Sequence, residues 1–244
     1  MKSSSSLSDQ RDQRGEFILD YVPDDVKVSI IAYSISCHFV LDLLKIEKLT
    51  TRATAVTSDS KPKKIDNIYF IFPAIERMKH TPYGKFLLPS LKYFTWLGRI
   101  LVLFSHAIPR AILFKILKTG FTSEGKAPPD EFITGILDMT HPVMLKEVMN
   151  LLEEAFEDVN QLDIETIEKN KERIMFYYGA TDGLCPKKYF YELKEKVPGV
   201  QAHLCQEGIH HTFMKHTSAK MAHLLKNMMD EQEKKATQTT QPIK

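Results

Sequence analysis

Four apolar runs of strand length recur along the chain, separated by segments in which apolar positions follow a helical period. The runs are residues 26–32 after the Pro23-Asp24-Asp25 turn, 68–72 before Pro73, 174–178 before Gly179, and about 200–204. Short apolar and β-branched runs bounded by turn residues are typical of buried strands. Strands that alternate with helices predict an α/β domain with a mostly parallel sheet of about four strands.

Helices are predicted in the segments between and after these runs. The segments are residues 15–22, 35–47, most of 83–160, a helix that begins near Pro186, and 216–233. Pro89, Pro109 and Pro128-Pro129 are predicted to break the long helical segment, because proline cannot donate to the helical hydrogen-bond ladder. We therefore expect an α/β core formed by residues 15–82 and 161–233, with residues 83–160 inserted as a helical cap.

Three polar segments lack an apolar period. Residues 1–14 and 234–244 are expected to be a disordered N-terminus and a disordered tail. Residues 48–66, rich in Thr, Ser and Lys, are expected to form a surface insertion or a disordered loop, because they are long for a connection within a compact domain.

Composition limits the class of protein. The chain has 244 residues, of which 43% are hydrophobic and 26% charged, as is ordinary for a globular domain. The net charge of +2 gives no reason to expect a nucleic-acid partner. Three scattered cysteines predict neither a disulfide framework nor a zinc site, and favour reduced thiols in a cytosol-facing protein. The polar N-terminus predicts no signal peptide. No run reaches the ~18 apolar residues of a membrane span, so any membrane contact is expected to be superficial.

The junction between the first strand and its helix carries a serine. Ser34 lies in the sequence Ala32-Tyr33-Ser34-Ile35-Ser36, where a strand runs directly into a helix. This is the context of a nucleophile elbow, whose usual pattern is G-x-S-x-G. Ala32 and Ser36 replace the two glycines, and both are small, as the close approach of strand and helix requires. The alternative is that Ser34 only caps the helix.

An acid and a histidine follow the third and fourth strands. Asp182 lies in the loop after residue 178, although an Asp-Gly pair also suits an ordinary turn. His211 lies in the loop after the last strand and could act as a general base, with a plain surface histidine as the alternative. The adjacent His210 and His211 could suggest a metal ion, but no third ligand has metal-site spacing. No metal or other cofactor is therefore expected.

Together the three residues indicate a catalytic site more strongly than any of them does alone. Their chain order is Ser34, Asp182, His211, each at the end of a predicted strand, which is the order of the α/β-hydrolase triad. In that arrangement His211 takes the proton from Ser34, while Asp182 fixes the tautomer of the imidazole and stabilises the imidazolium.

From about Phe17 to its end, the chain resembles the lipid-droplet-associated hydrolase family, which are serine lipid hydrolases of the α/β-hydrolase superfamily. The matching segments are residues 26–44, Phe72-Pro73-Ala74-Ile75-Glu76-Arg77-Met78, residues 176–186, and residues 209–213. The family's His-x-Phe motif matches His211-Thr212-Phe213, which assigns the base to His211 rather than His210. The elbow departs from the family in its lost glycines and in Tyr33, where the family has histidine.

The resemblance implies a serine hydrolase of lipid esters, with cholesteryl ester as a proposed substrate. It also implies a location on the lipid droplet surface and the endoplasmic reticulum, so the expected partners are a lipid ester substrate and the monolayer at that surface.

The family has several strands ahead of the elbow, so the resemblance also implies an N-terminally truncated form. The oxyanion hole needs the backbone N–H of Ile35 and a second N–H from a loop after an earlier strand. Loss of one such donor typically costs ~10²–10³ in rate. The first strand would also become an exposed edge that favours aggregation. The alternative to an active esterase is therefore a catalytically impaired protein that binds the lipid droplet surface.

Residues 85–123 combine apolar and basic side chains with Trp and Tyr and contain no acid. This composition suits an interfacial helix, and Pro109 predicts a helical hairpin that dips into one leaflet or a droplet monolayer. The side chains expected to contact lipid are Trp96, Leu97, Ile100, Leu101, Leu103 and Phe104. The alternative is a lid over the active site, and both could hold for one segment.

Overall fold

The computed structural model describes residues 6–23, 26–46, 65–105, 107–123 and 125–239. Within this part of the chain, four parallel strands form one sheet in the order β1-β2-β3-β4. The strands are β1 (Val28–Tyr33), β2 (Ile65–Ile71), β3 (Ile174–Tyr178) and β4 (Gln201–Leu204). The predicted α/β fold with a four-stranded parallel sheet is confirmed, and β1 lies at an edge of the described sheet.

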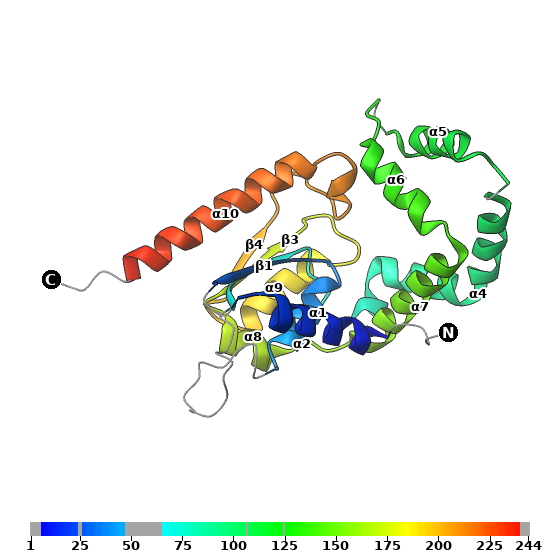
Figure 1. The fold of residues 1–244 in the computed structure, drawn as a ribbon. Coiled ribbons are helices and arrows are strands. Elements are labelled where there is room, and N and C mark those ends of the chain that lie inside the picture. Colours follow the sequence, from blue (N-terminus) through cyan, green and yellow to red (C-terminus); the bar gives the residue numbers. More distant parts are fainter. Residues whose placement is uncertain (1–5, 24–25, 47–64, 106, 124, 240–244) are drawn as a thin grey trace.

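Helices cover both faces of the sheet (Figure 1). One face is covered by α1 (Leu7–Tyr21), α2 (Ser36–Leu43), α8 (Ile164–Asn170) and α9 (Lys187–Lys196), and the other by α10 (Ser218–Thr239). A group of four helices lies beside the sheet: α4 (Pro82–Ser105), α5 (Arg110–Phe121), α6 (Asp130–Met139) and α7 (Pro142–Asp158). Two short 3₁₀ turns, η1 (Met78–His80) and η2 (Phe213–Lys215), complete the described elements.

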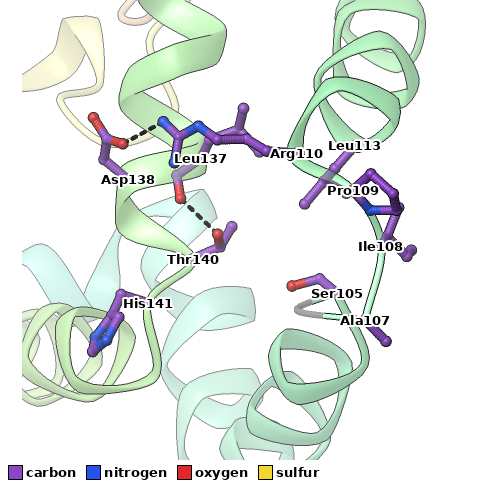
Figure 2. A pocket seen from close by; sticks show the side chains of 10 residues that line it. All are labelled: Ser105, Ala107, Ile108, Pro109, Arg110, Leu113, Leu137, Asp138, Thr140 and His141. Carbon is purple, nitrogen blue, oxygen red and sulfur yellow. Dashed lines mark hydrogen bonds and ion pairs between the residues drawn. The ribbon is translucent and has the colours of Figure 1, made fainter.

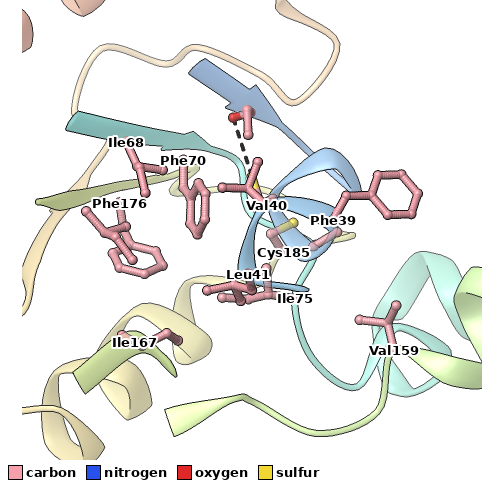
Figure 3. Close-up of a cluster of buried hydrophobic side chains, with 14 of the residues drawn as sticks. Phe39, Val40, Leu41, Ile68, Phe70, Ile75, Val159, Ile167, Phe176 and Cys185 are labelled. Atoms are coloured by element: carbon pink, nitrogen blue, oxygen red, sulfur yellow. Dashed lines mark hydrogen bonds between the residues drawn. The ribbon is translucent and has the colours of Figure 1, made fainter. Parts of the chain in front are cut away.

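The central strands are apolar over residues 68–71 of β2 and 174–178 of β3, where both faces are buried, as expected for a parallel sheet. Phe70 and Phe176 meet edge to face at 5.2 Å on the face that α2 and α8 cover (Figure 3). Tyr69 and Met175, one position earlier in each strand, lie on the opposite face under α10. The register pairs Ile71 with Tyr177 across β2 and β3. The carboxyl ends of the strands therefore meet at one edge of the sheet.

The predicted disorder was wrong for part of each terminus. Helix α1 begins at Leu7, because the Ser6 side chain accepts a hydrogen bond from the Asp9 N–H while the Asp9 carboxylate accepts one from the Ser6 N–H. Leu7 is buried, so residues 7–14 belong to the folded unit. Residues 234–239, which were also predicted to be disordered, form the end of α10. Residues 1–5 and 240–244 of the two predicted tails and residues 48–64 of the predicted loop lie outside the described residues, and β2 already begins at Ile65.

The predicted break at Pro89 was also wrong, whereas the breaks at Pro109 and at residues 128–129 are present. Helix α4 continues through Pro89, which is exposed on its surface. The Ser90 hydroxyl donates to the Phe86 carbonyl at 2.8 Å, which satisfies one of the carbonyls in the interrupted turn. Because this turn faces solvent, water can reach the carbonyl that the proline leaves without a partner.

Candidate active site

Ser34 occupies a sharp turn between β1 and α2. Its φ angle is 56°, in the left-handed region that non-glycine residues rarely adopt. The Ser34 N–H donates to the Ile71 carbonyl at 3.0 Å, and the Ser34 carbonyl accepts from the Ala74 N–H at 3.2 Å. These two bonds hold the strained residue against β2 and the segment that follows it. A serine held in this conformation at a strand-to-helix junction is the geometry of a nucleophile elbow.

Small side chains flank the turn. Ala32 is buried at the end of β1, where the Cys37 thiol of α2 donates to its carbonyl at 3.4 Å. Ser36 is the first residue of α2 and is partly buried. The alanine and the serine therefore meet the packing requirement that glycine usually meets in this motif.

The structure brings Ser34, Asp182 and His211 together, although the Ser34–His211 contact spans 177 positions. Nε2 of His211 lies 3.0 Å from Oγ of Ser34, and Nδ1 lies 2.6 Å from Oδ2 of Asp182. A carboxylate only accepts hydrogen bonds, so the network places the imidazole proton on Nδ1 and leaves Nε2 free to accept from the serine hydroxyl. His210 is exposed and takes no part in this chain of hydrogen bonds.

The Asp182 carboxylate is fixed by its own loop. Its second oxygen, Oδ1, accepts from the N–H groups of Leu184 at 2.8 Å and Cys185 at 3.0 Å. The loop also needs Gly179, because a Cβ atom there would lie 2.9 Å from the Phe72 ring and 3.0 Å from Cβ of Asp182. The carboxylate is thus aimed at the histidine before any substrate binds.

Two aromatic rings enclose the imidazole, and neither was predicted from the sequence. The centroid of the His211 ring lies 5.2 Å from that of Tyr33 and 5.5 Å from that of Phe72. The Tyr33 hydroxyl also donates to the His211 carbonyl at 2.7 Å. Burial raises the pKa of Tyr33, so it is a neutral donor throughout the physiological range. The sequence offered one signal, the bulky Tyr33 directly before Ser34. Its contact with His211 could not be predicted, because His211 lies in a loop far along the chain.

Cys185 lies close to Asp182 and His211, a proximity that no sequence pattern predicted. Ligand atoms of Asp182, Cys185 and His211 all lie within 4.8 Å of one another among the described residues, a spacing that a metal ion could use. However, Oδ2 and Nδ1 already bond each other, and the Cys185 thiol donates to the Phe72 carbonyl at 3.1 Å. Burial raises the pKa of this thiol well above its usual value, which disfavours the thiolate that metals bind. The chemistry of these donors therefore favours a proton relay.

Ile35, the predicted oxyanion donor, directly follows Ser34 at the N-cap of α2. The first N–H groups of a helix lack intrahelical acceptors and carry a partial positive charge. The position suits a developing oxyanion, and its role stays a prediction.

The residues predicted to contact lipid lie on α4. Trp96, Leu103 and Phe104 are 60%, 62% and 70% exposed, while Leu97 and Ile100 are about 40% exposed. Leu101 belongs to the same helix, but its side chain lies outside the described part of the structure. No helix in the described residues combines the length and hydropathy needed to cross a membrane.

Two pockets lie away from the triad. A pocket of about 630 Å³ opens between the end of α4, the start of α5 and the end of α6, with the Arg110–Asp138 ion pair at its wall (Figure 2). A groove of about 510 Å³ runs along the outer side of β1, between α1 and α2. Ser34, Asp182 and His211 line neither of these two pockets.

A family model described as lipid-droplet associated hydrolase matches residues 1–214. The lipid droplet-associated hydrolase of Drosophila melanogaster is 30% identical over 219 residues, which make up 88% of this chain and 66% of that relative. The human lipid droplet-associated hydrolase is 26% identical over 230 residues, or 92% of this chain and 64% of the human protein. The chain thus spans somewhat less than two thirds of the length of these relatives.

Solved structures show the same fold at low sequence identity. A carboxylesterase from the archaeon Nitrososphaera gargenis aligns with a TM-score of 0.57 and 14% identity, covering 96% of this chain and 75% of that one. A hydrolase from Oleispira antarctica aligns with a TM-score of 0.54 and 18% identity, covering 93% of this chain and 73% of that one. The described architecture is that of an α/β hydrolase.

Proposed function

The chain belongs to the lipid-droplet-associated hydrolase family, and on that premise we propose that it is a serine hydrolase of lipid esters, with Ser34, Asp182 and His211 as its triad. The observation that carries the proposal is the chain of hydrogen bonds from Asp182 through His211 to Ser34, at 2.6 and 3.0 Å. A serine in a left-handed turn is the second support. Cholesteryl ester, the substrate suggested by the resemblance, is one candidate within this class.

In the proposed reaction, Oγ of Ser34 attacks the acyl carbonyl carbon while its proton passes to Nε2 of His211. The imidazolium then protonates the leaving alcohol as the ester C–O bond breaks. Water attacks the acyl-enzyme with His211 again as base, and the fatty acid leaves as Ser34 regains its proton. Asp182 stabilises the imidazolium in both steps, and the Ile35 N–H is placed to donate to the oxyanion.

A fluorophosphonate probe tests the proposal directly, because it forms a covalent bond only with an activated serine. We expect the folded chain to be labelled, and the labelling to be lost in Ser34→Ala. The matched control is Ser29→Ala, which removes an exposed hydroxyl from the same strand and should leave labelling unchanged. Circular dichroism shows that each variant is folded.

Two results would overturn the esterase proposal. One is labelling that survives Ser34→Ala, and the other is a folded chain that is never labelled. The second result would favour the alternative, a catalytically impaired protein that binds a lipid surface, which the exposed apolar face of α4 independently supports.

We further propose that this face of α4 contacts the monolayer of a lipid droplet or the cytosol-facing leaflet of the endoplasmic reticulum. Tyr93, Trp96, Ile100 and Leu103 recur every three or four residues, so they share one side of the helix, and each is exposed. The relatives are named for lipid droplet association. On α5, the basic residues Arg110 and Lys118 form ion pairs with α6, at 2.6 Å to Asp138 and 2.5 Å to Asp130. Their charge is thus already paired within the protein. The lipid contact is therefore expected to depend on the aromatic and aliphatic residues more than on charge.

Flotation with triacylglycerol droplets coated with phosphatidylcholine tests the lipid contact. The variant Trp96→Ser/Phe104→Ser should partition at least about tenfold more weakly, because two large exposed side chains lose their burial in lipid. The control Phe17→Ser/Tyr21→Ser removes two exposed aromatic residues from α1 and should float as the unmodified chain does. Equal flotation of both variants and the unmodified chain would refute the contact.

A further inference from the structure

The loop that carries His211 has few anchors of its own. It follows β4 without regular secondary structure as far as η2. Cys205 anchors its start, since its N–H donates to the Tyr178 carbonyl at 2.8 Å and its sulfur accepts from the Ile209 N–H at 3.3 Å. The residues between these anchors are exposed, and Gly208 adopts a positive φ of 66°. The base therefore depends on contacts from elsewhere in the molecule to stay aligned.

Tyr33 supplies such a contact from the strand that carries the nucleophile. It is the last residue of β1, directly before Ser34, and its hydroxyl donates to the His211 carbonyl at 2.7 Å. Its ring packs against the imidazole at 5.2 Å, and the edge of the Phe213 ring meets it at the same distance. One side chain thus contacts the backbone of the base, its ring and the residue two positions later.

We propose that Tyr33 is a positioning residue that ties the base to the nucleophile; this inference rests on the proposed serine hydrolase function. Tyr33 and Ser34 are consecutive, and β1 is held in register with β2, where Tyr33 pairs with Ile71. A shift of the histidine loop away from β1 would therefore stretch the Tyr33–His211 hydrogen bond together with the Ser34–His211 contact, so the first bond opposes a change in the second. Displacements of about 1 Å in such a constellation can cost 10²-fold in rate, so one neutral hydrogen bond can affect turnover measurably.

The test is Tyr33→Phe, which removes the hydroxyl and keeps the ring. With a short-chain p-nitrophenyl ester, at a temperature where both proteins are fully folded, kcat should fall about tenfold while KM stays within about twofold. The matched control is Tyr178→Phe. Its hydroxyl is fully buried and has no hydrogen-bond partner among the described residues, so its removal should leave kcat unchanged.

A double variant separates positioning from a general structural effect. In a His211→Ala background, Tyr33→Phe should leave the residual rate unchanged, because the imidazole that Tyr33 positions is gone although the backbone carbonyl that accepts its hydrogen bond remains. A further drop in that background would assign Tyr33 a purely structural role and overturn the inference. If the unmodified chain turns over the ester and Tyr33→Phe matches it, the positioning role fails while the serine hydrolase stands. If the unmodified chain neither reacts with the fluorophosphonate probe nor turns over the ester, both proposals fall.

Discussion

At the scale of single residues, both oxygens of the Asp182 carboxylate have assigned partners. Oδ1 accepts from two backbone N–H groups of its own loop, which leaves Oδ2 to the histidine. The arrangement separates two tasks, because one oxygen orients the carboxylate and the other selects the tautomer of His211. An amide at this position could do the first task only.

Asp182→Asn is therefore expected to fold normally and to lower kcat for ester hydrolysis by about 10⁴-fold. An amide NH₂ in place of Oδ2 would face the Nδ1–H of His211 and favour the wrong imidazole tautomer. The control is Asp163→Asn, because Asp163 caps α8 through the Thr166 N–H at 3.0 Å and lies outside the triad. A loss smaller than tenfold, measured with the same ester, would speak against this role of Asp182.

Glu76 offers a prediction about stability. It is 3% exposed, and this burial raises the pKa of its carboxyl above the ordinary 4.5, even though Arg77 lies 2.6 Å away. A carboxyl with a raised pKa in the folded state contributes stability that is complete below pH 4.5 and is lost as the pH rises through the folded-state pKa. The ionised Glu76 carboxylate therefore contributes less stability to the folded chain than the neutral carboxyl does.

Glu76→Gln should consequently raise the thermal midpoint at pH 7.5 and bring no gain at pH 4. Differential scanning calorimetry at the two pH values measures this. Glu192→Gln, which removes the half-exposed partner of Arg77, is the control and should bring no gain at pH 7.5. A lower midpoint for Glu76→Gln at pH 7.5 would mean that the ion pair with Arg77 outweighs the cost of burial.

At the scale of elements, the start of α4 is set by a close backbone approach. A Cβ atom on Gly84 would lie 2.0 Å from the Met78 carbonyl oxygen, and the Gly84 N–H donates to the buried Thr81 hydroxyl at 2.9 Å. The first turn of α4 is thereby locked against η1. The exposed apolar face of α4 begins beyond this anchor, so the close approach at Gly84 helps to set the direction in which that face points.

Gly84→Ala should lower the free energy of unfolding by about 1–3 kcal/mol, because the backbone must move to admit the methyl group. Gly98→Ala in the same helix meets nothing within 4 Å and should gain roughly 0.5–1 kcal/mol from helix propensity. Urea unfolding of the two variants compares the sites. Equal effects of the two substitutions would show that the contact at Gly84 is relaxed in solution.

The boundaries of elements show where local patterns suffice. The apolar run at residues 174–178 coincides with β3, and the other three predicted strands lie within about three residues of their observed ends. The start of α1 could also have been read from Ser6 and Asp9, which form a capping box three positions apart, but the polar composition hid it. The continuation of α4 through Pro89 could not be predicted, because whether a proline breaks a helix depends on whether solvent can reach the interrupted turn.

At the scale of the whole molecule, the meeting of Ser34, Asp182 and His211 was predictable because each lies in the segment that follows a recognisable strand, and parallel strands align their carboxyl ends. What the sequence did not reveal is the tertiary environment of that triad. The contacts of Tyr33, Phe72 and Cys185 with it join segments that only the finished sheet brings together. Residue type alone gives no signal for such contacts.

Since the site draws on three of the four described strands, its integrity should follow that of the sheet. In a urea titration, we expect fluorophosphonate labelling of Ser34 and the far-ultraviolet circular dichroism signal to disappear in one transition, as for a cooperative unit. Labelling that vanishes at clearly lower urea would instead show that the histidine loop opens locally while the sheet is intact.

The strand order matches the chain order, and this has a consequence for how the protein is made. Of the described strands, a growing chain presents β1 and Ser34 before it adds β2 and β3, and it supplies His211 only after β4. Synthesis proceeds from the N-terminus, and parallel pairing must wait for each crossover to be complete. On the proposed function, a nascent chain on the ribosome would thus carry an inert serine until all four described strands had emerged, so that hydrolytic competence would arrive with the last of them.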